Sequence, residues 1–596
     1  MPWSFEPALS ESSLGRDAQA HLFARLRRTL SRADLQLDDW WYKTSDAGTR
    51  CIKSFDPMPQ GGQYEKGFFS GSLQQFQEQV QLPLHLYHAC FNADTIYRKE
   101  QGGEFRFDSN DRNFAQVSAA DAYAFYSELW RNATAKTGGH FVGSEVDHQV
   151  DEVHALATHR NSTSYAQAYY AGMSRAAVEA GISLQYCMST PRHTLGSIGM
   201  QAVTHARASY DNHGSVLENM APLFASSLFL QAINLKPSKD NVQTRLNGRG
   251  GSHRDAALEA AVATLSCGPV GIGDGLASFL GSGSNVSLVL ATCNSNGSLL
   301  QPSRPASGID AMFTRGWNPG LLALPPSGFI SVTHTHAASA AAEYSSSAMV
   351  SGGANVSSWL VLVIAAGTEF QLSPAQLFPR PPPGTGAAAP AFWVSRWTDS
   401  AKCVNGSDAV STGCLRLWES SDRDLPVRTG ATSQANHQNK DGFYYPWELT
   451  TLCKDLDASS GRCNPSSLNH HLLGTVRRLT RSRNGVAPLS HADPRAGRSQ
   501  KWVLLGEMSK FVRLSPGRVR SMDDLDGGGL RVCVYGAQGE RVLLSALAPG
   551  STVVHTLALL VGGDLWEERG GGQGGWVQCG TFAAGSSQSV AQEGAT

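Results

Sequence analysis

The sequence predicts an α/β protein: a (β/α)8 TIM barrel whose first strand is missing, followed by an all-β, sandwich-like C-terminal domain. From about residue 30 to 275, short apolar segments alternate with helical ones, and nearly every apolar segment ends in polar or aromatic residues. Beyond about residue 320 the helical periodicity stops, and Val-, Leu- and Ser-rich runs alternate with turns. We therefore assign residues 1–318 to the barrel and 319–596 to the β-rich accessory domain.

Seven apolar segments are the expected barrel strands, and helical spacing lies between them. These strands are 35–37, 84–87, 141–146, 184–188, 203–208, 230–235 and 262–265. One helix opens near Ser118 and runs through AYAFYSELW, and a second ends at Gly181, a natural left-handed cap. Residues 17–31 are expected to form the first helix, so the first strand would lie upstream of Met1 or be unrecognisable.

Polar residues at the strand ends favour a barrel over an open sheet. An open sheet concentrates its ligand site at one switch point, whereas a barrel gathers residues from the ends of many strands. Seven clusters follow the expected strands. They begin at Asp38, His88, Glu145, Ser189, Arg207, Ser238 and Gly273.

Composition excludes several classes of protein. The 596 residues carry 49 basic and 50 acidic side chains, a net charge of −1, so binding of nucleic acid through bulk positive charge is excluded. A disordered acidic chain is excluded for the same reason. No apolar run reaches the 18 or so residues that span a bilayer. No signal peptide is recognisable, although six Asn-x-Ser/Thr sequons occur, so the compartment stays open, as does the oligomeric state.

The second half of the chain reads as strands, namely FISVTHTH, WLVLVIAA, LRVCVYG, RVLLSAL and VVHTLALLV. Of the 11 cysteines, Cys403/Cys414 and Cys453/Cys463 are close pairs that could be disulfides in an oxidising compartment. The five cysteines before residue 300 are expected mostly to pack as small apolar residues. No histidine or cysteine group has metal-site spacing, so no metal and no cofactor are expected.

Two carboxylates at strand ends suggest glycoside hydrolysis. Asp147 follows the segment FVGSEV, and Asp211 follows VTHARASY two strands later. In a retaining glycosidase one ionised carboxylate attacks the anomeric carbon while a protonated one donates to the leaving oxygen. The alternative is that both residues are helix N-caps, a common role for an aspartate that follows a strand.

Six motifs in order carry a family resemblance: LQLDDWW, SEVDHQ, ARASYD, KPSKDN, SCGPVGIGDG and RPASGID. Over about residues 34–313 the chain resembles the barrel of the raffinose synthase and alkaline α-galactosidase group, within the clan of retaining α-galactosidases. The resemblance implies a hydrolase for terminal α-galactosyl, raffinose-type oligosaccharides, working by double displacement without a cofactor. It also implies that this chain is truncated at its N-terminus.

The resemblance implies roles for individual residues. Asp147 would be the nucleophile and Asp211 the acid/base. The residues expected to contact the substrate are Asp38, Asp39, Trp40, Trp41, His88, Glu145, Arg207, Lys239, Asp240 and Asp274. For Trp40 and Trp41 we expect at least one ring to be core, and a single strand-end histidine such as His88 is as often structural.

The chain departs from the family pattern at Glu145, where the clan has a lysine two residues before the nucleophile. Strand alternation puts Glu145 on the face that carries Asp147, and a second carboxylate there would raise the pKa of Asp147. We expect Lys239 to be the compensating cation. Two other functions stay open: a galactosyl transglycosylase, in which a sugar replaces water, and an inactive barrel that binds carbohydrate.

Overall fold

The computed structural model describes two compact units, Met1–Val289 and Leu290–Thr596. The sequence placed the boundary later, at 318/319. The described residues are 4–5, 33–39, 41–45, 51–57, 72–211, 216–242, 244, 256–273, 286–309, 329–336, 356–364, 370–372, 391–397, 399–419, 425–427, 447–454, 502–525, 528–562, 566–569 and 573–583. Each unit is described by itself below.

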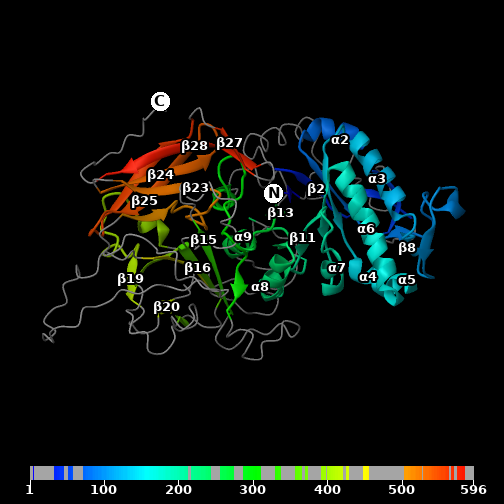
Figure 1. Ribbon diagram of the computed structural model, residues 1–596, viewed down its shortest axis with the longest axis horizontal. Helices are drawn as coiled ribbons and strands as arrows, with labels where there is room; N and C mark the ends of the chain where they lie inside the picture. Colours follow the sequence, from blue (N-terminus) through cyan, green and yellow to red (C-terminus); the bar gives the residue numbers. More distant parts are fainter. Residues whose placement is uncertain are drawn as a thin grey trace. The chain divides into compact units, whose positions relative to one another are not determined.

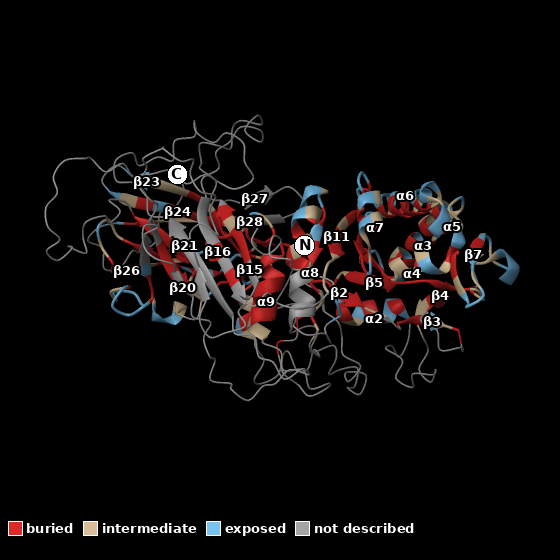
Figure 2. Ribbon diagram, turned by 90° about the horizontal axis from the view of Figure 1, so that it is seen from below, coloured by how far each residue is buried: buried red, intermediate tan, exposed pale blue. Residues whose placement is uncertain are grey.

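A parallel six-stranded sheet forms the centre of the first unit, in the order β12-β11-β10-β9-β5-β2 (Figure 1). Every neighbouring pair in this sheet is parallel. Both faces are buried, as expected where helices connect parallel strands (Figure 2). The strands are β2 Leu35–Leu37, β5 Leu84–His88, β9 Phe141–Val146, β10 Ser183–Tyr186, β11 Val203–Arg207 and β12 Lys236–Ser238.

A short additional strand lies near the start of the chain, where the sequence analysis predicted no strand. β1, Ser4–Phe5, pairs in parallel with β13, Gly271–Ile272, and also contacts β2. A single parallel bridge joins Val242, beyond the end of β12, to Ile272 of β13. The sequence did not reveal β1 because two residues are too few to show alternation. The predicted helix at 17–31 lies outside the described residues.

Two expected strands were wrong, because residues 230–232 end helix α8 and residues 262–265 lie in helix α9. The strands that follow them are β12 and β13. Both helices are apolar over most of their surface, and such a helix cannot be told from a buried strand by periodicity. In the described ranges up to residue 290, the α-helices are α2 Leu73–Val80, α3 Ala122–Lys136, α4 Gln149–Ala155, α5 Ala157–Asn161, α6 Thr163–Ala180, α7 Pro191–Gly196, α8 Val216–Ala232, α9 Ala256–Leu265 and α11 Val286–Leu290.

Helices α3 and α6 confirm the helix predicted to open near Ser118 and the helix predicted to end at Gly181. The two helices pack side by side (Figure 1). The Ser162 side chain accepts a hydrogen bond from the Tyr165 backbone at the start of α6. Gly181 ends α6 in the left-handed conformation, with φ 70°. Buried aromatic side chains of α3, among them Trp130 and Tyr126, cover one face of the parallel sheet.

A second, smaller sheet in the first unit has the order β3-β4-β6-β8-β7. Its strands are β3 Tyr42–Thr44, β4 Ile52–Pro57, β6 Phe91–Asn92, β7 Phe107–Ser109 and β8 Phe114–Val117. Cys51, just before β4, forms a disulfide with Cys90, just before β6. Cys187, Cys267 and Cys293 are buried thiols, as expected for most of the five cysteines before residue 300. Separation by 39 residues hid the Cys51–Cys90 pair in the sequence.

The second unit is built from antiparallel sheets, which confirms a β-rich C-terminal region. A six-stranded sheet has the order β14-β15-β16-β21-β18-β19, and smaller sheets have the orders β22-β25-β26, β23-β24-β28-β27 and β17-β20. The strands are β14 Ser307–Gly308, β15 Phe329–His336, β16 Val356–Ile364, β17 Phe370–Leu372, β18 Ala391–Arg396, β19 Arg416–Glu419, β20 Leu425–Val427, β21 Trp447–Lys454, β22 Val503–Gly506, β23 Val519–Leu525, β24 Gly529–Gly536, β25 Arg541–Leu547, β26 Val554–Leu560, β27 Trp566–Arg569 and β28 Gln573–Phe582.

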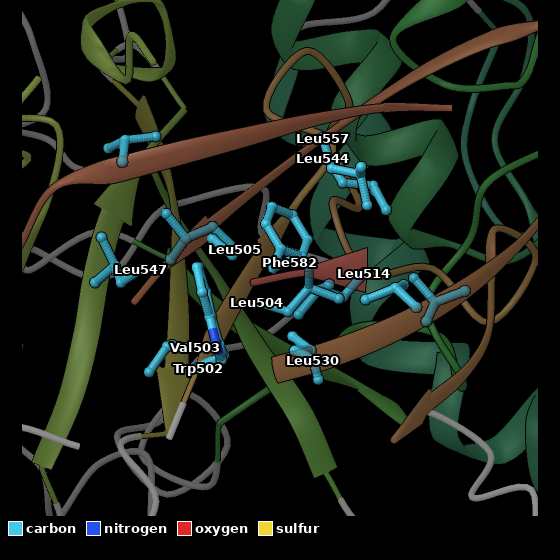
Figure 3. Packing of buried hydrophobic residues seen from close by; sticks show 14 of the residues in the cluster. Trp502, Val503, Leu504, Leu505, Leu514, Leu530, Leu544, Leu547, Leu557 and Phe582 are labelled. Carbon is cyan, nitrogen blue, oxygen red and sulfur yellow. The ribbon is translucent and has the colours of Figure 1, made fainter. Parts of the chain in front are cut away.

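One hydrophobic core joins two of these sheets in the manner of a sandwich. Leu544 and Leu557 of one sheet and Leu530 and Phe582 of the other belong to the same buried cluster (Figure 3). A buried ion network lies in the same unit: the Arg518 guanidinium is 2.8 Å from a Glu507 oxygen and 2.6 Å from a Glu540 oxygen.

Two disulfides occur in the second unit. Cys403–Cys414 is one of the two pairs that sequence spacing suggested, and Cys533–Cys579 joins neighbouring strands β24 and β28. Of the other suggested pair, Cys453 lies in β21 and Cys463 lies outside the described residues. Within the described part of the chain, no helix is long and apolar enough to cross a membrane.

We predict that the Cys51–Cys90 disulfide stabilises the first unit. The double variant C51A/C90A should lose about 2–4 kcal/mol in free energy of unfolding, because the native crosslink restricts the unfolded chain. Denaturant unfolding of the full chain, followed by a signal from the first unit, measures the loss. The variant C403A/C414A is the control, because its disulfide lies in the other unit and should leave that transition unchanged.

Candidate functional site

A polar pocket lies at the carboxyl edge of the parallel sheet. Because all strands of such a sheet run the same way, residues at their C-terminal ends meet at one edge. The pocket is lined by Gln36, Asp38, Glu145, Gln185, Arg207, Ser238, Lys239, Asp240, Asn241, Pro269 and Gly271. Five of the residues that the sequence singled out therefore lie in one pocket, namely Asp38, Glu145, Arg207, Lys239 and Asp240.

Strand alternation explains which side chains reach the pocket. Successive residues of a strand point to opposite faces, so Glu145 and Asp147 share a face while Ser144 and Val146 occupy the other. The Ser144 hydroxyl hydrogen-bonds to His88 Nδ1, at 2.8 Å, on the helix-covered face. Buried polar groups therefore occupy both faces of β9.

Asp147 is held at one carboxylate oxygen. Its Oδ2 accepts a hydrogen bond from the Tyr87 hydroxyl at 2.9 Å, and its backbone N–H donates to the His88 carbonyl at 3.0 Å. Oδ1 is buried without a hydrogen-bond partner among the described residues. His148 follows in the left-handed conformation, φ 59°, with its Nε2 3.7 Å from Asp147 Oδ2 and its Nδ1 2.6 Å from Asp151 Oδ2.

Glu145 is a buried carboxyl group close to other acids. Its Oε2 accepts a hydrogen bond from the Gln36 amide. Burial raises the pKa of Glu145 well above its usual value, and the charges of Asp38 and Asp147 raise it further. Arg207 opposes this rise without cancelling it. Burial therefore favours the protonated form of Glu145.

Asp38 and Asp39 follow β2 and differ in environment. Burial raises the pKa of Asp38 to about 7, even though the Asp39 backbone N–H donates to its Oδ1 at 2.7 Å. Neighbouring carboxylates, Asp240 first among them, add to the rise. Asp39 Oδ1 accepts a hydrogen bond from the Tyr42 hydroxyl at 2.6 Å.

Arg207 joins Asp211 to Asp240. Its Nη2 lies 2.6 Å from Asp211 Oδ1 and its Nη1 lies 3.4 Å from Asp240 Oδ1. The Arg207 side chain is 14% exposed and that of Asp211 is 56% exposed. Arg207 is therefore a mostly buried residue of the pocket lining, whereas Asp211 is exposed and is not a lining residue.

Lys239 does not compensate the charge of Glu145, which corrects our expectation. Its Nζ lies 2.9 Å from Glu259 Oε2 of helix α9 and donates to the Asn241 carbonyl at 2.9 Å. Lys239 is a lining residue of the pocket, but its ammonium group pairs with helix α9. Arg207 is the cation that acts on Glu145.

Two other expected contact residues are core side chains. Trp41 is 1% exposed, packs edge-on against Phe55 with centroids 4.7 Å apart, and donates from Nε1 to the Tyr87 carbonyl at 2.9 Å. The His88 ring lies 5.3 Å from that of Trp130, on the helix-covered face. The structure therefore does not bring Trp41 or His88 into the pocket. Trp40 and Asp274 lie outside the described residues.

Three site residues escaped the sequence analysis: Gln36, Gln185 and Tyr87. Gln36 and Gln185 line the pocket, and Tyr87 contacts Asp147. Counting alternate positions back from the strand ends would have found all three, since Gln36 precedes Asp38 by two positions and Tyr87 pairs with Glu145 in the sheet register. Within the described ranges, no three His, Cys, Asp or Glu side chains are grouped to hold a metal ion.

No protein-family model matches the sequence, and no curated protein matches it. Among solved structures, an α-galactosidase from Thermus thermophilus in complex with stachyose is 17% identical, with a TM-score of 0.32 over 46% of this chain and 61% of that one. An α-galactosidase from Lactobacillus brevis is 11% identical, with a TM-score of 0.43 over 79% of this chain and 56% of that one. A GH36 α-galactosidase from Geobacillus stearothermophilus is 11% identical, with a TM-score of 0.43 over 76% and 55%.

This chain thus matches less than two thirds of the length of each of these enzymes. TM-scores below 0.5 at such identities establish neither a shared fold nor a shared activity. The residues of the pocket carry the functional inference instead.

We predict that Asp38 makes stability fall as pH rises. Because burial raises its pKa from 3.8 to about 7, the folded chain holds a proton between about pH 4 and 7 that the unfolded chain has lost. The free energy of unfolding of D38N minus that of the native chain should therefore increase with pH across this window, by at most about 1.4 kcal/mol per pH unit. Urea unfolding at several pH values measures it. D111N, at an exposed turn residue, should show no such trend.

Proposed function

We propose that this chain is a retaining glycoside hydrolase that acts on terminal α-galactosyl groups, with Asp147 as nucleophile and Asp211 as acid/base. The observation that carries the proposal is the environment of the two carboxylate oxygens of Asp147. One of its oxygens is held by Tyr87, and the other is buried without a hydrogen bond in the described part of the chain. Asp147 lies close to Asp38 and Glu145, two acids that line the polar pocket. The family resemblance of the six motifs supplies the substrate class.

The proposal includes a (β/α)8 barrel for the first unit. Six parallel strands in sequential order, with β1 paired to β13 and lying against β2, support closure through eight strands. The bridge between Val242 and Ile272 supports the step from β12 to β13. The pocket at the C-terminal strand ends fits the position of active sites in barrel enzymes.

In the first step, an oxygen of Asp147 bonds to the anomeric carbon while the bond from that carbon to the aglycone oxygen breaks. Asp211 gives its proton to the leaving oxygen. In the second step, Asp211 takes a proton from water, the water oxygen bonds to the anomeric carbon, and the bond to Asp147 breaks. Two inversions retain the configuration.

The remaining pocket groups suit a neutral sugar rich in hydroxyls. Carboxylates such as Asp240 accept strong hydrogen bonds from hydroxyls, and Glu145, whose protonated form burial favours, can also donate. Arg207 pairs with Asp211 at 2.6 Å and can donate to a sugar oxygen from the same guanidinium.

A transglycosylase uses the same two carboxylates with a sugar in place of water. Incubation with raffinose and an acceptor sugar distinguishes a hydrolase from a transglycosylase, because released galactose reports hydrolysis and a lengthened acceptor reports transfer. A carbohydrate-binding protein without activity would bind raffinose and yield neither product.

We predict that D147G abolishes turnover of p-nitrophenyl α-galactoside, by roughly 10⁴–10⁶-fold, as when the nucleophile of a hydrolase is removed. Azide should restore part of the rate, because the small anion fits the vacated space and attacks the anomeric carbon to give a β-galactosyl azide. Product analysis by NMR identifies the azide. The exposed D111N is the control and should keep full activity. Full turnover by D147N would refute the assignment of the nucleophile.

We also predict that D211A discriminates between leaving groups. Loss of a general acid costs about 10²–10⁴-fold, but only where the leaving oxygen needs a proton. The rate of formation of the galactosyl-enzyme should therefore fall strongly with raffinose and little with p-nitrophenyl galactoside, whose phenolate leaves readily. Equal losses with both substrates would contradict the acid role. Pre-steady-state release of each leaving group gives the comparison.

A further inference from the structure

Two buried tyrosines lie stacked beside the carboxylates. The rings of Tyr42 and Tyr87 are parallel to within 10°, with centroids 6.2 Å apart. Neither ring is more than 2% exposed. Their hydroxyls donate to different acids, Tyr42 to Asp39 Oδ1 at 2.6 Å and Tyr87 to Asp147 Oδ2 at 2.9 Å. The stack therefore connects the end of β2 to the end of β9 by way of β3 and β5.

Both phenols stay protonated and act as donors. Burial, followed by the charges of neighbouring carboxylates, raises the pKa of each tyrosine well above its usual value. A carboxylate that accepts a hydrogen bond is favoured in its ionised form. A neutral phenol can thus hold a buried carboxylate without adding a charge to the pocket.

The stack is itself fixed by its surroundings. Trp41 Nε1 donates to the Tyr87 carbonyl at 2.9 Å, and the Trp41 ring packs edge-on against Tyr42 at 5.8 Å. The His88 carbonyl, next in the chain to Tyr87, accepts the Asp147 backbone N–H at 3.0 Å. Asp147 is therefore anchored to β5 through both its backbone and its side chain.

We propose that Tyr87 is a positioning residue that fixes the orientation of the Asp147 carboxylate and directs its second oxygen, Oδ1, toward the substrate, and that Tyr42 fixes the carboxylate of Asp39 in the same way. This inference rests on the proposed function of Asp147. A hydrogen bond to Oδ2 restricts rotation of the carboxylate about its side chain, so the unpartnered oxygen keeps one direction. Correct orientation of a reacting atom is worth large factors in rate.

The test compares Y87F and Y42F with the native chain, using the dependence of kcat/KM on pH. The other titratable groups close to Asp147 are Asp38, Glu145, His88, His148 and Cys187, and all remain in both variants. Loss of a donor to the ionised form raises the pKa of the acceptor. We expect Y87F to move the acid limb upward by about one pH unit and to lower kcat with little change in KM.

Y42F should instead raise KM and leave the acid limb in place, because Asp39 binds sugar hydroxyls and does not react. The matched control is Y123F. The Tyr123 hydroxyl donates to Glu179 at 2.7 Å between α3 and α6, so this change removes the same kind of contact away from the pocket. It should alter neither kcat, KM nor the pH profile. Far-UV circular dichroism checks that each variant is folded.

The outcomes separate this inference from the function beneath it. If the native chain turns over galactosides and Y87F keeps its kcat and its acid limb, the positioning role is refuted and the hydrolase assignment stands. If the native chain and D147G are equally inactive on every galactoside, the proposed function fails and the positioning role fails with it. An upward shift in Y87F that is absent from Y42F and Y123F supports the inference.

Discussion

The alternation of side chains along parallel strands is the constraint on which the pocket depends. Gln36 lies in β2, and Asp38 follows it by two positions. Glu145 lies in β9, and Asp147 likewise follows it by two positions. The two members of each pair therefore point to the same face of the sheet. The residues between the members of each pair point to the opposite, helix-covered face. On that face the His88 ring of β5 packs against Trp130. A shift of one residue in the register of β9 would exchange these two sets and remove the acids from the pocket.

Placing several carboxyl groups on one buried face has an electrostatic consequence. Burial disfavours the charged form, and like charges add to the effect, so the pKa of Asp38 rises to about 7 and that of Glu145 rises well above its usual value. Lys239 does not relieve them because it pairs with Glu259 of helix α9. Arg207 supplies positive charge to Glu145, Asp211 and Asp240 together, while hydrogen bonds from Tyr42 and Tyr87 stabilise Asp39 and Asp147.

Local sequence patterns were sufficient where an element has strong periodicity of its own. Strands β2, β5, β9, β10 and β11, helices α3 and α6, and strands β15, β16, β24, β25 and β26 of the second unit were predicted, whereas the long strands β21, β23 and β28 were not. The patterns failed at the apolar ends of α8 and α9, because a helix buried on most sides loses its polar face. They failed also at Ser4–Phe5, whose pairing with β13 is a contact between the ends of the first unit.

The sequence by itself determined which acids stand at strand ends and which of them share a face, because both follow from spacing along one strand. Only the tertiary structure decided their partners. That Tyr87 reaches Asp147, that Lys239 turns to Glu259 and that Cys51 bonds to Cys90 depend on the register between strands and on helix packing. Such contacts join residues tens of positions apart, and no local pattern encodes their distance.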